Sequence, residues 1–69
     1  MRRDQEQILC ILAEATEPLF ASEITYQLNK RLFASMPYSN IQVVMVLTAL
    51  GPQLEQDSQG RWMLKGRLT

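Results

Sequence analysis

Apolar residues recur at intervals of three and four along three segments of the chain, and this spacing places them on one face of an α-helix. It predicts helices over residues 5–15, 22–33 and 41–50. The expected core stripes of the first two helices are Ile8, Ile11, Leu12 and Ala15, then Ile24 and Leu28 followed by Arg31 or Leu32.

Polar residues, prolines and a glycine mark the expected ends of these helices. Asp4 with Gln7, and Ser39 with Gln42, have the spacing of a capping box, and Ser22 offers an N-cap to the second helix. Proline at position 18 and the Gly-Pro pair at 51–52 stop the first and third helices.

Residues 54–65 predict a β-hairpin, with strands over 54–57 and 61–65 around a turn at 58–60. The pair at 19–20 is long enough for a minimal further strand. Alternation in the last strand predicts one face directed to the core and one directed outward. The inward residues are Trp62 and Leu64, and the outward ones are Arg61, Met63 and Lys65.

The order helix, short strand, helix, helix, hairpin is typical of a winged helix-turn-helix, a mainly α fold with a small β-hairpin. The chain has 69 residues, 46% of them hydrophobic, so we expect residues 1–69 to form a single domain. Because it starts with Met1, we expect it to be a complete protein.

Three segments resemble the HARE-type winged helix. They are residues 8–15 (ILCILAEA), residues 17–24 (EPLFASEI), similar to the family's Pro-Leu and Glu-Ile helix start, and residues 60–64 (GRWML), similar to its closing Gly-x-Trp-x-Leu strand. That family is found in Asx-like chromatin proteins, in some restriction endonucleases and in the RNA polymerase delta subunit. The resemblance implies a role in nucleic-acid transactions, and it leaves both DNA and protein open as the partner.

The third predicted helix is apolar on both sides. Its expected core face carries Val43, Val46, Leu47 and Leu50, and its opposite face carries Ile41, Val44, Met45 and Thr48. No charged residue occurs from Leu32 through Leu54, so this helix lacks the side chains that read guanine. Two interpretations stay open: the fold buries more of the helix than its periodicity indicates, or the second face contacts protein, as a homodimer seam or a docking surface.

Contact with nucleic acid is the leading functional hypothesis, and the protein contact of the third helix is the alternative to it. Seven Lys or Arg balance seven Asp or Glu, which disfavours strong DNA binding. Cations nevertheless gather in and after the hairpin, and polar groups start the third helix. These residues predict a DNA-binding or transcription-associated regulator that contacts the phosphate backbone of duplex DNA: Ser39, Asn40, Gln42, Arg61, Lys65 and Arg67.

Catalysis is not expected. The chain has no histidine and a single cysteine, Cys10, which excludes an internal disulfide framework and a classical zinc site. Cys10 lies near Glu6 and Glu14, which oppose thiolate formation, so we expect it not to act as a nucleophile. We also expect no metal and no cofactor. No segment predicts a signal peptide or a membrane span, so we expect a cytoplasmic protein without a membrane partner, and a homodimer.

Overall fold

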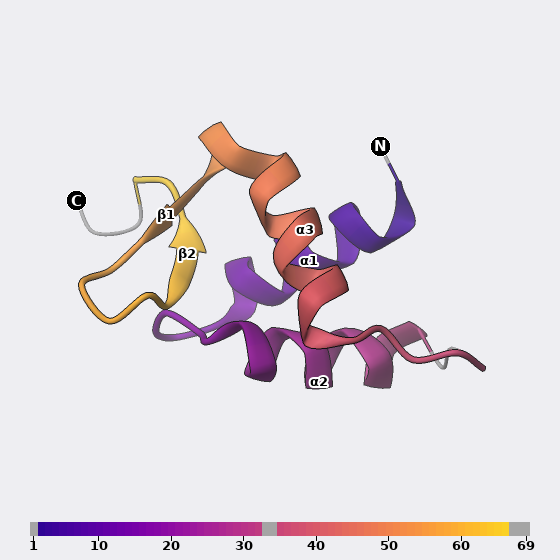
Figure 1. The fold of residues 1–69 in the computed structure, drawn as a ribbon. Coiled ribbons are helices and arrows are strands. Elements are labelled where there is room, and N and C mark those ends of the chain that lie inside the picture. The colour runs from indigo at the N-terminus through magenta and orange to yellow at the C-terminus, as the bar shows by residue number, and fades with distance from the viewer. Residues whose placement is uncertain (1, 33–34, 67–69) are drawn as a thin grey trace.

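The computed structural model describes residues 2–32 and 35–66 (Figure 1). Three helices, α1 (Arg3–Glu14), α2 (Ala21–Leu32) and α3 (Asn40–Leu50), precede the 3-10 turn η1 (Gly51–Gln53) and the strands β1 (Leu54–Gln56) and β2 (Trp62–Leu64). The mainly helical class with a small hairpin is confirmed. Each predicted helix end within the described residues lies within two residues of the observed one, and Phe33, the predicted end of the second helix, lies outside them.

The core lies where the three helices meet. Helix α3 crosses α1, and α2 packs against both of them (Figure 1). Each helix contributes side chains that are at most 1% exposed, and the predicted stripes supply them: Ile8, Leu12, Ile24, Leu28, Val43 and Leu47. Ala15, predicted as the last member of the first stripe, is instead the C-cap of α1, and its amide donates to the Ile11 carbonyl over 3.1 Å.

Strand β2 has backbone pairing partners on both of its edges. β1 pairs with it antiparallel, with Leu54 opposite Leu64 and Gln56 opposite Trp62. On the other side, the Leu19 amide donates to the Trp62 carbonyl over 3.0 Å and the Trp62 amide to the Leu19 carbonyl over 2.7 Å. This isolated bridge confirms a minimal strand at Leu19 and makes β2 the central strand.

The prediction that Met63 faces outward is wrong. Its side chain is 2% exposed, whereas Trp62 and Leu64 are partly buried and pack against the core as expected. The pleat places Met63 on the face of β2 opposite Trp62 and Leu64, so both faces of this strand are covered. Alternation along a strand whose two faces are both covered cannot indicate which residues meet solvent.

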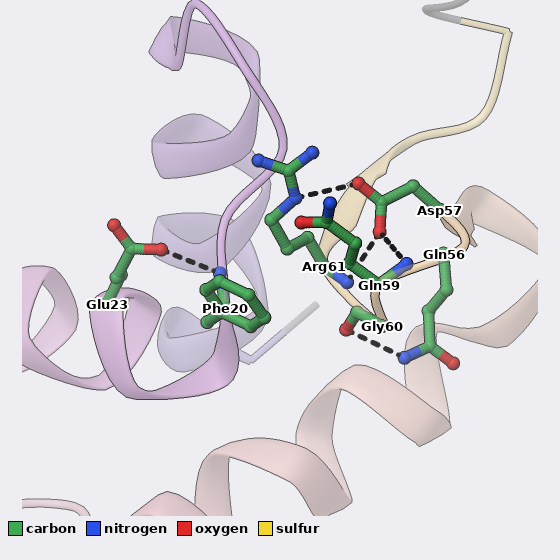
Figure 2. Close-up of polar contacts among 7 residues, drawn as sticks. All are labelled: Phe20, Glu23, Gln56, Asp57, Gln59, Gly60 and Arg61. Atoms are coloured by element: carbon green, nitrogen blue, oxygen red, sulfur yellow. Dashed lines mark hydrogen bonds and ion pairs between the residues drawn. The ribbon is translucent and has the colours of Figure 1, made fainter.

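Two of the three predicted helix caps are also wrong. Asp4 lies inside α1, where the Arg2 amide donates to Gln5 Oε1 over 3.3 Å, so the helix begins two residues earlier. The predicted cap Ser22 lies inside α2, and the preceding Phe20 amide donates to Glu23 Oε1 over 2.9 Å (Figure 2). Only the third signature, Ser39 with Gln42, is confirmed as a capping box.

Candidate interaction surface

Helix α3 divides into a buried side and an exposed side. The predicted core residues Val43, Val46, Leu47 and Leu50 are all buried. The opposite side, which we call the outer α3 face, consists of Ile41, Val44, Met45 and Thr48, and all four are exposed. The interpretation that the fold buries both sides of this helix is therefore wrong for the single chain.

The outer α3 face is both apolar and prominent. Ile41 is 75% exposed, Met45 66% and Val44 40%. The hydroxyl of Thr48 donates to the Val44 carbonyl over 2.8 Å, so its polar group is satisfied within the helix. Neither α3 nor the segments that flank it carry a charge between Leu32 and Leu54, and the face therefore presents water with hydrocarbon and few polar atoms.

A cleft of about 330 Å³ lies beside this face, between α3 and the start of α1. Met45 belongs to both the face and the cleft, so the two form one continuous surface. The side of the cleft formed by α3 is mostly apolar, while Arg2 and Tyr38 lie opposite. The lining residues are Arg2, Gln5, Tyr38, Gln42, Met45, Val46 and Ala49.

Sequence reasoning missed the polar cluster that supports this cleft. Asp4 is only 3% exposed, and it accepts hydrogen bonds from Arg2 over 2.8 Å, from the Gln5 amide over 2.8 Å and from the Tyr38 hydroxyl over 3.2 Å. The main chain of Tyr38 is held in turn by Asn29, whose side-chain amide donates to the Tyr38 carbonyl over 3.0 Å and accepts from its amide over 2.8 Å. This cluster fixes the start of α1 against the connector before α3.

Burial raises the pKa of the Tyr38 hydroxyl, and the adjacent carboxylate of Asp4 raises it further by its charge and by accepting the hydrogen bond. The phenol therefore stays protonated and donates to Asp4. No sequence signal pointed to this pair, because its members are 34 positions apart.

Two of the three polar residues expected to hold a phosphate at the start of α3 bond to each other in the capping box. Ser39 Oγ accepts from the Gln42 amide over 3.2 Å, and Gln42 Oε1 accepts from the Ser39 amide over 2.8 Å. Asn40 is exposed beside them. The hairpin follows the C-terminal end of α3, and the two ends of this helix are about 16 Å apart along its axis.

The cations expected in the hairpin have different surroundings. Arg61 Nε donates to Asp57 Oδ2 over 2.7 Å, and its guanidinium lies 6.0 Å from the centre of the Phe20 ring (Figure 2). Lys65 is exposed just after β2, and Arg67 lies outside the described residues. Of the predicted phosphate contacts, Arg61 is thus already bonded to Asp57, whereas Lys65 is exposed to solvent.

Asp57 organises the whole hairpin turn (Figure 2). Its Oδ1 accepts from the amides of Gln59 and Arg61, both over 2.9 Å. Partial burial acts to raise the pKa of Asp57, but the hydrogen bonds from Arg61 and Gln59 and the charge of Arg61 outweigh it, so the pKa is lowered. Arg61 therefore acts first as the structural partner of this carboxylate.

Within residues 2–32 and 35–66, no three His, Cys, Asp or Glu side chains lie close enough together to hold a metal ion. None of the helices in that part of the chain is long and apolar enough to cross a bilayer. Cys10 is exposed on α1.

Comparison of the chain with models of protein families, with curated proteins and with solved structures found no match in any of the three. The resemblance to the HARE-type winged helix stays a prediction from sequence.

Proposed function

We propose that this protein is a small, non-catalytic winged-helix domain that acts by binding another protein through the outer α3 face. The order of three helices, a strand-like bridge at Leu19 and a hairpin supports the winged-helix assignment. The observation that carries the function is the exposure of Ile41, Val44 and Met45 on a helix without charge. Exposed apolar patches of this kind mark interaction sites.

Folding of the single chain does not require this face. The inner side of α3 already closes the core, whereas each large apolar side chain left in water forgoes about 1.5–3 kcal/mol relative to full burial. Binding to a partner recovers part of this free energy. The satisfied hydroxyl of Thr48 adds no polar group that a partner would have to match.

Protein is a better partner for α3 than DNA. Base reading in the major groove relies on Arg, Lys, Asn or Gln side chains, and the outer α3 face offers aliphatic and sulfur atoms instead. At the helix start, the capping box already occupies the backbone amides of Ser39 and Gln42, two of the donors that a phosphate would use there.

Photo-crosslinking from α3 tests the proposal. A benzoylphenylalanine photo-crosslinker replaces Met45 in one variant and Tyr26 in another, because both side chains are 66% exposed and only Met45 lies on the outer α3 face. Upon irradiation of cells that express the chain, we expect a protein adduct from position 45 and none from position 26. Adding Ile41→Glu should abolish the adduct. The absence of any position-45 adduct would refute the proposal.

A second candidate function, contact with the phosphate backbone of duplex DNA, is favoured by the exposed Lys65 at the end of the hairpin. Its test is binding to duplex DNA at two salt concentrations. Lys65→Gln should weaken binding and reduce its salt dependence, whereas Lys30→Gln, which removes another exposed charge, on α2, should not. Equal effects of the two substitutions would indicate attraction without a hairpin site. Arg61→Ala is a poor probe because it also deprives Asp57 of its partner.

A further inference from the structure

We infer that the occupant of the outer α3 face is a second copy of this chain, packed with its α3 antiparallel across a two-fold axis between Val44 and Met45. This inference rests on the proposed function and names its partner.

The outer α3 face is symmetric along the helix. Ile41 and Thr48 are equally distant from the midpoint between Val44 and Met45, which is also close to the middle of Asn40–Leu50. A two-fold interface uses the same patch on both subunits, so that the contact of one residue with another occurs twice. Rotation about this midpoint superimposes the set of four positions on itself.

Antiparallel packing also matches side-chain sizes. It places Ile41 against Thr48 of the second copy and Val44 against Met45, so that a larger side chain meets a smaller one along the whole seam. Parallel packing would instead place Ile41 against Ile41 at one end and Thr48 against Thr48 at the other. The seam would then be wide at one end and narrow at the other, which the close packing of interfaces disfavours.

Charge on this side of the molecule suits a second copy. None of the four residues of the outer α3 face is charged, so the seam between two such faces opposes no like charges. The charged residue that lines the adjoining cleft, Arg2, is ion-paired with Asp4, and its side chain is 72% exposed at the edge of this surface. The zero net charge of the chain also removes long-range repulsion between copies. A different protein is commonly selected by charge complementarity, and this face offers no charge to complement.

The cleft continues the same pairing. Antiparallel packing brings Asn40 of the second copy next to Ala49, which lines the cleft. Ala49 is small and leaves room there, while Gln42 and Gln5 provide amide groups in the same cleft. A polar side chain from the second copy therefore meets polar groups at the edge of an apolar seam, as is usual at protein interfaces.

The dimer should be weak. An eleven-residue helix offers a strip about 16 Å long and about 10 Å wide, which buries roughly a few hundred Å² per copy, less than the ~800 Å² of a standard interface. We expect a dissociation constant of about 10 µM or higher. Sedimentation equilibrium of the unmodified chain should show a mass that rises from one chain toward two as the concentration passes through this range.

Disulfide trapping tests the arrangement. In a Cys10→Ser background, Ile41→Cys and Thr48→Cys are made separately, one with an isotope label, mixed at high concentration and oxidised. Antiparallel packing predicts a disulfide between the two variants, because residues 41 and 48 face each other. Neither variant should bridge to itself, since its two copies lie about 10 Å apart along the seam, beyond disulfide reach. Tyr26→Cys, on α2, measures random collision.

Each outcome decides between specific arrangements. A mixed 41–48 disulfide in clear excess over the Tyr26→Cys background supports the inference. Self-bridging of Ile41→Cys at the same level indicates parallel packing and overturns it. No excess over background, together with a monomeric mass at all concentrations, also overturns it. If Met45 then still crosslinks to a different protein in cells, the proposed function stands without the second copy; if it crosslinks to nothing, both fail.

Discussion

Alanine substitutions at Leu47 and Met45 separate the two sides of α3 energetically. The two residues are neighbours on the same helix, but Leu47 is 0% exposed and Met45 is 66% exposed. Truncating a fully buried leucine costs about 2–5 kcal/mol, because its transfer free energy is lost and a cavity remains. For Met45→Ala we expect a change within about 0.5 kcal/mol, because most of the side chain is already in water and alanine favours the helix.

The loss at Leu47 is large for this chain. A 69-residue domain has a free energy of unfolding of about 3–10 kcal/mol, so Leu47→Ala removes a substantial part of it. At about 4–8 °C per kcal/mol for a domain of this size, its melting temperature should fall by at least ~8 °C. Met45→Ala should melt within about 4 °C of the parent chain.

Urea unfolding followed by circular dichroism measures both variants, with the protein at about 1 µM so that the outer α3 face is free of any weak dimer. The dependence of the free energy on urea should be unchanged, since the fold is the same. A loss above about 1.5 kcal/mol for Met45→Ala would show that this side chain belongs to the core of the single chain. A loss below about 1 kcal/mol for Leu47→Ala would show that α3 is rotated from the orientation described.

Three further predictions concern the polar contacts and the hairpin. Because the pKa of Asp57 is below its ordinary value of 3.8, its contribution to stability is present above about pH 4 and is lost as the pH falls through the lowered value; Asp57→Asn should therefore flatten the acid limb of a stability–pH curve, and an unchanged limb would contradict this role. Gly60→Ala should destabilise by about 1–2 kcal/mol in thermal melts, because φ is +82° and the new Cβ meets nothing closer than Gln56 at 3.9 Å, so backbone strain alone acts. Tyr38→Phe should cost about 1 kcal/mol in urea unfolding and abolish any loss of stability due to tyrosine ionisation above pH 10; equal alkaline profiles for the two chains would argue against the bond to Asp4.

The helical part of the fold was predictable because periodicity records burial directly. The four inner residues of α3 were correctly separated from the four outer ones, although both sets are mainly apolar. What decided the assignment was their angular position on the helix, and a stripe of this width leaves little freedom to rotate. The exposed face followed from the same pattern.

The hairpin and caps were less predictable because they depend on contacts between distant segments. Met63 is buried on a strand that packs against α1 and is paired with Leu19 as well as with β1, and alternation along one strand contains no information about such neighbours. Likewise, Asp4 has the sequence features of a helix cap, but it lies in a buried cluster where it accepts a hydrogen bond from Tyr38, 34 positions away. Local signals fail where a tertiary partner competes for the same side chain.

Counting cations also overestimated the charge that the hairpin can offer. Arg61 and Lys65 were grouped by strand alternation, but the turn folds Asp57 back onto Arg61 four positions later. A local signal existed: an Asp three residues before a turn glycine commonly accepts backbone amides in the turn, and a following arginine is then within reach. Of the two hairpin cations in the described residues, Lys65 is therefore more available to bind a ligand than Arg61.

The outer α3 face needs an explanation that the folding of one chain does not supply. A charged residue at position 41 or 45 would cost little stability, because both side chains project into water, and it would lower the risk of aggregation. The chain instead carries isoleucine and methionine there, within a stretch of α3 and its flanks that has no charge at all. A contact that buries these side chains gives the missing reason, since the substitution that is harmless to the monomer is the one that such a contact does not tolerate. Met45→Glu should therefore change the free energy of unfolding of the single chain only slightly, but it should greatly weaken association.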